Sequence, residues 1–367
     1  VCIRDIKDEK YIKETSLDFC KKQKLKEALM KSVDLIQSSS FDEVRNVIDE
    51  ALKLGTSNDF GHDFLKDFES RYELKTRNPV TTGWGKIDNL LKKGLGSGEM
   101  GVVIAPTGAG KSMALAHLGA HAVKAGKNVV HYTLELSEAV TGQRYDSCIS
   151  TIPLSTLFGR KDEVLESIAD LKGTLIIKEY PTKTASTNNI RTHLEKLKKR
   201  NKKVDMIIVD YADLLKSCSH HKEKRNELES IYESLRAIAQ EYKCPVWTAS
   251  QTNRTGLNAE VVTMESISEA FNKCFVADFI CSISRTIKDK NANTARLFIA
   301  KNRNGPDGLV FPMFIDTSTV QLKVLGQAEV PNITPDLDPE DLASALREKY
   351  KQHRKSTIRG NDNGSSQ

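Results

Sequence analysis

Ala105-Pro-Thr-Gly-Ala-Gly-Lys-Ser112 lies between an apolar run, Val102–Ala105, and a stretch rich in alanine and leucine, Ser112–Lys124. A glycine-rich turn between a strand and a helix presents backbone N–H groups that can surround a polyphosphate. The lysine of such a loop reaches the β- and γ-phosphates, and the serine hydroxyl binds Mg²⁺. The usual first glycine is alanine here, but the strand–loop–helix order preserves the mechanism. We therefore expect a site for ATP or another NTP with Mg²⁺, formed by Pro106, Thr107, Gly108, Ala109, Gly110, Lys111, Ser112 and Met113.

Short apolar runs alternate with amphipathic stretches from Gly101 onward. This order is typical of an α/β domain around a mainly parallel central sheet. The later runs Leu309–Phe314 and Val320–Val324 follow each other without a helix, and they predict a hairpin at the sheet edge. The other expected strands are Val102–Ala105, Val129–Leu134, Leu175–Ile177, Met206–Val209, Val246–Ala249, Phe279–Ile283 and Leu297–Ala300, and the clearest expected helices are Ser112–Lys124, Ile190–Arg200 and Glu227–Tyr242.

Composition divides the chain into three parts. Residues 1–75 have apolar side chains at helical intervals among many lysines and glutamates, which predicts two or three helices with too little apolar surface for a core of their own. Residues 76–326 form the expected α/β core. Residues 327–367 predict a mostly disordered tail with room for a short helix beginning at Asp338. The chain begins with Val1 rather than Met, so we expect that sequence upstream is missing.

Overall composition narrows the class of protein. Hydrophobic residues make up 39% of the 367 residues and charged residues 28%, which excludes wholesale disorder and low-complexity polymers. We find neither a membrane-spanning run nor a secretory leader, so we expect a cytoplasmic protein. The seven cysteines include no C-x-x-C pair and predict free thiols rather than a disulfide framework or a zinc ribbon. The net charge of +6 permits a nucleic-acid partner without requiring one.

Three polar residues end expected strands near the phosphate loop. Asp210 follows Met206–Val209 directly, and in a phosphate-binding α/β domain this acid lies beside the metal ion. Gln251 ends the strand next to that of Asp210, where it can touch the γ-phosphate and the following loop. Glu135 ends the strand after the phosphate-loop helix, and two interpretations remain open: activation of the attacking water, or a solvated or ion-paired strand end.

Lys301 and Arg303 lie two residues apart on an extended segment, so they point to the same face. A turn from Asn304 to Pro306 limits their mobility. Such a pair is suited to an arginine finger that reaches a γ-phosphate, on the next subunit if the protein forms a ring. An exposed basic turn is the alternative that spacing alone leaves open.

Together these motifs resemble the hexameric replicative helicases of the DnaB type, most closely those of large tailed phages. The resemblance runs from about Glu9 to Val324, and alanine at the start of the phosphate loop is ordinary in that family. It implies a RecA-like core that assembles as a ring, moves 5′ to 3′ on single-stranded DNA and unwinds duplex DNA with ATP. It also implies that residues 1–75 hold the end of the family's N-terminal domain and its linker helix. The supporting strings are Gly61–Tyr72, Ala105–Ser112, Thr133–Leu136, Leu175–Thr182, Ile208–Tyr211, Ser250–Arg254 and Lys301–Pro306.

Carried over by position, the resemblance assigns a role to each candidate site residue. Lys111 and Ser112 contact phosphate and Mg²⁺, Asp210 supports the metal ion, and Glu135 activates water. Gln251 couples the γ-phosphate to DNA, and Lys301 with Arg303 acts on the neighbouring subunit's nucleotide.

Two segments are candidates for DNA contact. The stretch from Lys216 to Arg225 is a local basic cluster suited to phosphates, although a solvated flexible loop is an open alternative. The loop after Gln251 ends in a string that aligns with the family's DNA-contacting stretch, with Ser268 where the family has arginine. Aromatic residues are only 6% of the chain, which favours contact with the DNA backbone over base stacking. The candidates are Lys216, Lys222, Lys224, Arg225, Arg254, Glu269, Phe271 and Asn272.

Two other functions share the same core. A RecA-type recombinase would use ATP to hold a filament on single-stranded DNA, and a non-motor loader would use the nucleotide as a switch. By resemblance, the expected partners are single-stranded DNA, further copies of the chain, a primase, a helicase loader and a single-strand-binding protein. A phage origin would place the protein in the cytoplasm of a bacterial host.

Overall fold

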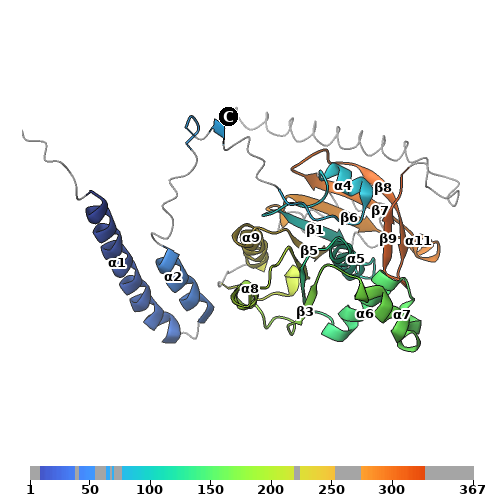
Figure 1. The fold of residues 1–367 in the computed structure, drawn as a ribbon, viewed down its shortest axis with the longest axis horizontal. Coiled ribbons are helices and arrows are strands. Elements are labelled where there is room, and N and C mark those ends of the chain that lie inside the picture. The colour runs from blue at the N-terminus through green and yellow to red at the C-terminus, as the bar shows by residue number, and fades with distance from the viewer. Residues whose placement is uncertain are drawn as a thin grey trace, which may run out of the picture. The chain divides into compact units, whose positions relative to one another are not determined.

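The computed structural model describes residues 9–37, 41–53, 63–66, 68–69, 77–218, 224–252 and 274–326 (Figure 1). The chain divides into two compact units, of which the first lies mainly within residues 1–76 and the second begins at Arg77. No helix in the described ranges is both long and apolar enough to cross a membrane. The predicted helix at Asp338 lies outside these ranges.

The first unit contains two helices, α1 (Glu9–Gln37) and α2 (Phe41–Lys53), which pack on each other. Small side chains are buried in this pair, namely Ala28, Ser32 and Ala51, and the Ser32 hydroxyl donates to the Ala28 carbonyl at 2.7 Å. Most of the large apolar side chains stay exposed, so the pair buries little apolar area. The exposed ones are Phe19, Leu29, Met30, Val33, Ile36, Phe41 and Leu52.

The second unit is built around a nine-stranded sheet with the order β3-β2-β4-β5-β1-β6-β7-β8-β9. The first six strands in that order run parallel, and β6 to β9 pair in antiparallel fashion. The mainly parallel sheet and the hairpin at its edge are therefore confirmed. The strands are β1 (Met100–Ala105), β2 (Val129–Thr133), β3 (Leu175–Glu179), β4 (Met206–Asp210), β5 (Val246–Gln251), β6 (Phe279–Ser284), β7 (Thr294–Asn302), β8 (Val310–Asp316) and β9 (Gln321–Val324).

Helices cover both faces of the parallel part of the sheet, which makes a three-layer α/β/α core (Figure 1). Alternate β1 residues, Val102 and Ile104, share a cluster with α8 (Thr187–Lys199) and α9 (Lys224–Tyr242). The intervening residues share a second cluster with α4 (Gly85–Leu90) and α5 (Lys111–Lys124). Because both faces are covered, every residue of β1 is buried, as expected for a central parallel strand.

Several helices were not anticipated from the sequence. The helix α6 (Glu138–Ser150) buries the polar side chains Thr141 and Ser147, which weakens the apolar periodicity that would reveal it. The helix α7 (Lys161–Ala169) buries only Val164. The other short helices that were not anticipated are α4, η1 (Leu154–Gly159), η2 (Ala212–Leu214) and α11 (Ile287–Asn291).

Two contacts join distant parts of the second unit. The indole of Trp84 donates from Nε1 to the Leu322 carbonyl at 3.1 Å, which links the segment before β1 to β9. At Gly101, an added Cβ would lie 2.6 Å from the Trp247 ring, so only glycine lets β5 pack this indole against β1. These contacts fix the central strand that leads into the phosphate loop.

Candidate nucleotide-binding site

The phosphate loop connects β1 to α5 at the carboxyl edge of the parallel strands. Gly108 and Gly110 have φ values of 74° and 107°, in the left-handed region that favours glycine. An added Cβ at Gly110 would meet nothing within 4 Å, so this glycine is required by its backbone conformation rather than by lack of space. The N-terminus of α5 follows immediately, with its free N–H groups and positive dipole end at the loop. The predicted strand–loop–helix arrangement is confirmed.

The Lys111 side chain folds back over the loop. Its Nζ donates to the carbonyls of Ala105 and Pro106, each at 3.2 Å, and lies 5.9 Å from the centre of the Tyr211 ring. Burial lowers the pKa of Lys111, while the carboxylates of Glu135, Asp210 and Asp213 oppose this shift. A partly desolvated ammonium with only neutral acceptors is suited to bind an anion that reaches the loop.

Ser112 and Asp210, the two residues predicted to serve the metal ion, lie in direct contact. The Ser112 hydroxyl donates to Asp210 Oδ1 at 3.1 Å, which links the first turn of α5 to the end of β4. Asp210 is buried, and this burial raises its pKa to about 6, although Ser112, Arg144 and Lys111 favour the ionised form. A hydroxyl and a carboxylate in contact are the oxygen donors that Mg²⁺ prefers, so the residues present fit this ion.

Glu135 follows β2 by two residues and is exposed. Its negative charge raises the pKa of Lys111, Asp210 and Arg144. Glu135 therefore lies close to all three, at the same edge of the sheet. Arg144, on α6, is partly buried, and this burial lowers its pKa, while the charges of Asp210 and Glu135 act in the opposite direction. This arginine was not anticipated, because its position at the site depends on α6.

Gln251 ends β5 next to the phosphate loop. Its side chain donates from Nε2 to the Thr107 hydroxyl at 2.6 Å. Because β5 pairs with β1 and with β4, this side chain lies on the strand between those that carry the loop and Asp210. The predicted adjacency of the Gln251 and Asp210 strands is confirmed, and the direct link to the loop is a new observation.

Lys301 and Arg303 lie at the end of β7, and their contacts are with the segment that precedes β6. Lys301 donates from Nζ to the Phe275 carbonyl at 2.5 Å and lies 4.3 Å from the centre of the Phe275 ring. Arg303 pairs with Asp278 at 2.9 Å, and Arg236 pairs with the same carboxylate at 3.0 Å. The backbone N–H of Met100 also donates to Asp278, at 3.0 Å. Asp278 thus fixes the base of the predicted finger.

Of the predicted DNA contacts, only part lies in the described ranges. Lys216 is exposed and forms an isolated parallel bridge with Ser186, Lys224 begins α9, and Arg225 is exposed in the first turn of that helix. A further cation, which was not anticipated, lies near the phosphate loop. It is Lys290 on α11, whose Nζ is 3.9 Å from the position that a Cβ on Gly108 would occupy. The predicted contacts outside the described ranges are Lys222, Arg254, Glu269, Phe271 and Asn272.

The mainly parallel sheet and the glycine-rich loop between β1 and α5 together define an α/β domain with the strand–loop–helix arrangement of P-loop proteins. Residues 79–321 match the family model of the DnaB-like helicase C-terminal domain, and the chain belongs to this family. The chain is 30% identical over 281 residues to the DnaB-like replicative helicase of Enterobacteria phage T4, an alignment that covers 71% of this chain and 58% of the relative. It is 27% identical over 253 residues to the replicative DNA helicase DnaB of Geobacillus stearothermophilus, covering 64% of this chain and 54% of that one. The family predicted from the motifs is thereby confirmed.

Solved structures support the same fold. One of them, an ATPase domain, superposes with a TM-score of 0.61 at 17% identity, covering 72% of this chain and 100% of that domain. A DnaB-like replicative helicase, from a study of its interactions with primase, gives a TM-score of 0.60 at 17% identity over 88% of this chain and 80% of that one. The chain spans little more than half the length of the curated relatives named above.

Proposed function

We propose that this chain is the motor part of an ATP-driven replicative DNA helicase, which assembles as a ring and moves 5′ to 3′ on single-stranded DNA. The observation that carries the proposal is the contact between the Ser112 hydroxyl and Asp210, which joins the phosphate-loop helix to β4 at 3.1 Å. Membership of the DnaB-like family supports DNA as the polymer along which the motor moves. Residues 1–75 would serve as a linker to a neighbouring subunit, residues 76–326 as the motor, and residues 327–367 as a tail.

ATP and Mg²⁺ would bind at the carboxyl edge of the sheet. The glycine-rich loop, residues 106–110, and Met113 would line the phosphate chain, and Ser112 with Asp210 would hold Mg²⁺, which neutralises phosphate charge when bound. Lys111 would exchange its two carbonyl acceptors for phosphate oxygens. Exposed Glu135 would orient and deprotonate the attacking water.

The hydrogen bond from Gln251 to Thr107 supports a coupling role for Gln251. A γ-phosphate that reaches Thr107 would compete for this amide, and Gln251 is followed directly by the loop proposed to contact DNA. Occupation of the nucleotide site would therefore change the position of that loop.

Lys301 and Arg303 would complete the site of the adjacent protomer. Their contacts within their own chain are with Phe275 and Asp278, so they are held on a surface separate from this chain's phosphate loop. Arg303 is the better candidate for the phosphate contact, since 44% of its side chain is exposed and guanidinium binds phosphate oxygens in pairs.

DNA would be held through its phosphates by the basic stretch from Lys216 to Arg225 and by the loop after Gln251, residues Arg254 to Asn272. Contact through phosphates predicts affinity that falls steeply as salt rises. A primase, a helicase loader and a single-strand-binding protein are the protein partners that we propose, in the cytoplasm of a bacterial host.

The test is unwinding of a forked DNA duplex with ATP, with the Lys111→Ala variant as the inactive control. We expect strand separation by the wild-type chain, and ring-shaped particles on electron micrographs. Helical filaments on DNA would instead indicate a recombinase. ATP hydrolysis without strand separation, unchanged by an upstream extension of the chain, would indicate a nucleotide-switched loader.

A further inference from the structure

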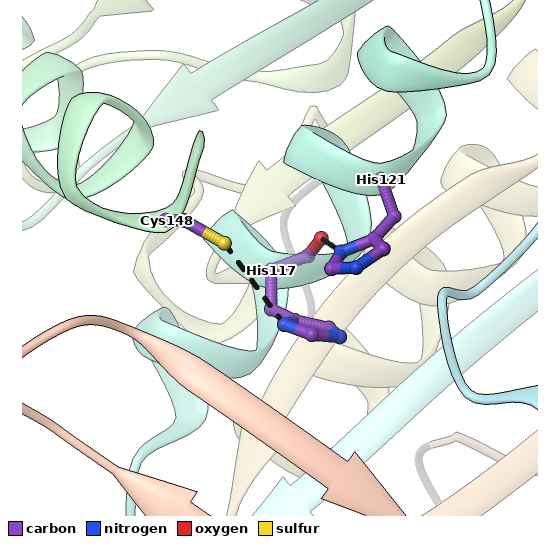
Figure 2. Close-up of side chains that lie close together, drawn as sticks. All are labelled: His117, His121 and Cys148. Carbon is purple, nitrogen blue, oxygen red and sulfur yellow. Dashed lines mark hydrogen bonds between the residues drawn. The ribbon is translucent and has the colours of Figure 1, made fainter. Parts of the chain in front are cut away.

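A cluster of three metal-ligand side chains lies away from the phosphate loop, between α5 and α6. His117 and His121 are four residues apart and so occupy one face of α5, and Cys148 comes from α6 (Figure 2). Each residue offers one ligand atom, and these three atoms lie within 4.8 Å of one another. His117 and Cys148 are buried, while His121 is only partly buried and leaves one side open to solvent.

Distances within the cluster fit a zinc ion after a small contraction. His117 Nδ1 lies 4.0 Å from Cys148 Sγ. Tetrahedral zinc with sulfur and nitrogen ligands holds such atoms about 3.5 Å apart. Side-chain rotations that shorten the separations between the three donors by about 0.5–1.3 Å would therefore be enough to seat the ion.

Hydrogen bonding orients one ring in the manner of a metal ligand. His121 Nδ1 faces the His117 carbonyl at 3.0 Å, where a proton on Nδ1 would be donated (Figure 2). This leaves the Nε2 lone pair of His121 free for an ion, as is usual for zinc-bound histidines that donate their other N–H to a carbonyl. His117 Nε2 is buried and lies outside ordinary hydrogen-bond geometry with every described residue, although the backbone of Val320 acts to raise the pKa of this ring against its burial.

We propose that His117, His121 and Cys148 bind Zn²⁺, with water as a fourth ligand on the side of His121. Two imidazoles and a thiolate form a borderline-soft donor set that favours Zn²⁺ over Mg²⁺. The ion would join the phosphate-loop helix to the helix that carries Arg144, so it would stabilise the frame of the nucleotide site. The proposal does not depend on helicase activity, because the three residues lie outside the residues assigned to ATP and DNA.

The test is titration of the full chain with Zn²⁺ and, as a spectroscopic probe, Co²⁺, each in the absence of nucleotide. We expect one ion per chain and a thiolate-to-Co²⁺ charge-transfer band, with no competition from excess Mg²⁺. Trp84 provides a second readout, because its ring stacks on His117 with the centroids 5.8 Å apart. Paramagnetic Co²⁺ should quench Trp84 fluorescence, and the Trp84→Phe variant should lose this quenching but keep the charge-transfer band.

Substitutions within the cluster distinguish a metal-binding site from side chains that are only packed together in the core. Cys148→Ser should remove the charge-transfer band, and both Cys148→Ser and His121→Gln should weaken Zn²⁺ binding by more than about 100-fold, since even outer-shell changes cost 10- to 100-fold. The matched controls Cys244→Ser and His193→Gln change a buried cysteine and a helical histidine elsewhere, and they should leave affinity unchanged.

One further variant probes the charge at the site. Lys124 donates to the Cys148 carbonyl at 3.3 Å, so a cation lies beside the cluster. Lys124→Gln should tighten Zn²⁺ binding, because it removes like-charge repulsion. Absence of the charge-transfer band in the wild-type chain, or Co²⁺ affinity that survives His121→Gln, would overturn the proposal. His121→Gln serves this purpose even if Cys148→Ser fails to fold, because His121 is partly exposed.

Discussion

Replacement of Arg303 by alanine should abolish DNA-stimulated ATP turnover without loss of stability. Among the residues that the structure describes, Arg303 forms an ion pair with Asp278 alone, at 2.9 Å, and 44% of its side chain is exposed. Such a pair contributes at most about 1 kcal/mol to the free energy of unfolding. Asp278 keeps its contacts with Arg236 and with the Met100 N–H, so no buried charge is left without a partner.

The expected loss of activity is far larger than the loss of stability. An arginine finger contributes about 10³-fold or more to phosphoryl transfer. A 10³-fold loss of rate corresponds to about 4 kcal/mol of transition-state stabilisation. Turnover measured with saturating single-stranded DNA should therefore fall by about three orders of magnitude. Binding of a fluorescent ATP analogue and the midpoint of chemical unfolding should stay close to the wild-type values.

Arg236→Ala is the matched control, because it removes the other arginine from the same carboxylate. Arg236 donates two hydrogen bonds to Asp278, at 3.0 and 3.3 Å, and is less exposed than Arg303. We expect a stability loss of about 1–3 kcal/mol with turnover retained. Normal turnover by the Arg303→Ala variant would refute the reasoning.

Mixed assemblies test whether Arg303 acts on a neighbour. A Lys111→Ala protomer retains Arg303, and an Arg303→Ala protomer retains Lys111. In a random one-to-one mixture of a ring, about a quarter of the interfaces combine both intact residues. Activity should therefore reappear on mixing, to about a quarter of the wild-type rate if the sites act independently. No recovery in rings that demonstrably contain both variants would place Arg303 in its own chain's site.

Three further predictions concern other residues. Glu135→Gln should lower turnover by about 10²- to 10⁴-fold while ATP affinity is retained, and normal turnover in a steady-state assay would exclude its role as base. Gln251→Ala, which loses the bond to Thr107, should retain basal hydrolysis but lose its stimulation by DNA, and stimulation equal to wild type would contradict a coupling role. Burial lowers the pKa of His131 to about 3, and the ring is held neutral against the Tyr145 hydroxyl at 2.8 Å. Because the unfolded pKa is higher, the stability from neutral His131 is complete above about pH 6.5 and decreases by about 2 kcal/mol by pH 5. Urea unfolding across this range should show a smaller decrease for His131→Gln, and an unchanged slope would contradict the assignment.

The sequence predicted the structure best where the local apolar pattern and the rules of parallel-sheet topology lead to the same arrangement. The strand before the phosphate loop is an apolar run buried on both faces, so its type is evident from composition alone. Ser112 and Asp210 are 98 residues apart, yet their meeting was predictable because parallel strands in a P-loop domain bring their carboxyl ends to one edge.

Features that depend on tertiary packing were not predictable. Helix α6 buries polar side chains, so its periodicity does not mark it, and Arg144 could not be assigned to the site without it. The carboxylate that holds Arg303 belongs to Asp278, a residue between expected elements with no local signal of its role. The cluster of His117, His121 and Cys148 was likewise invisible, because the spacing from α5 to α6 matches no simple ligand motif.

The position of β1 in the sheet affects how the protein is made. Its neighbours, β5 and β6, are encoded far downstream, so β1 has no strand partner on the ribosome until residue 251 has been synthesised, and one of its edges stays open until residue 284. At about 5–20 residues per second, the interval from residue 105 to residue 284 lasts roughly 10–40 s. A nascent chain in that interval displays an apolar strand to chaperones, and a truncated product ending before β5 has no assembled pocket for a nucleotide.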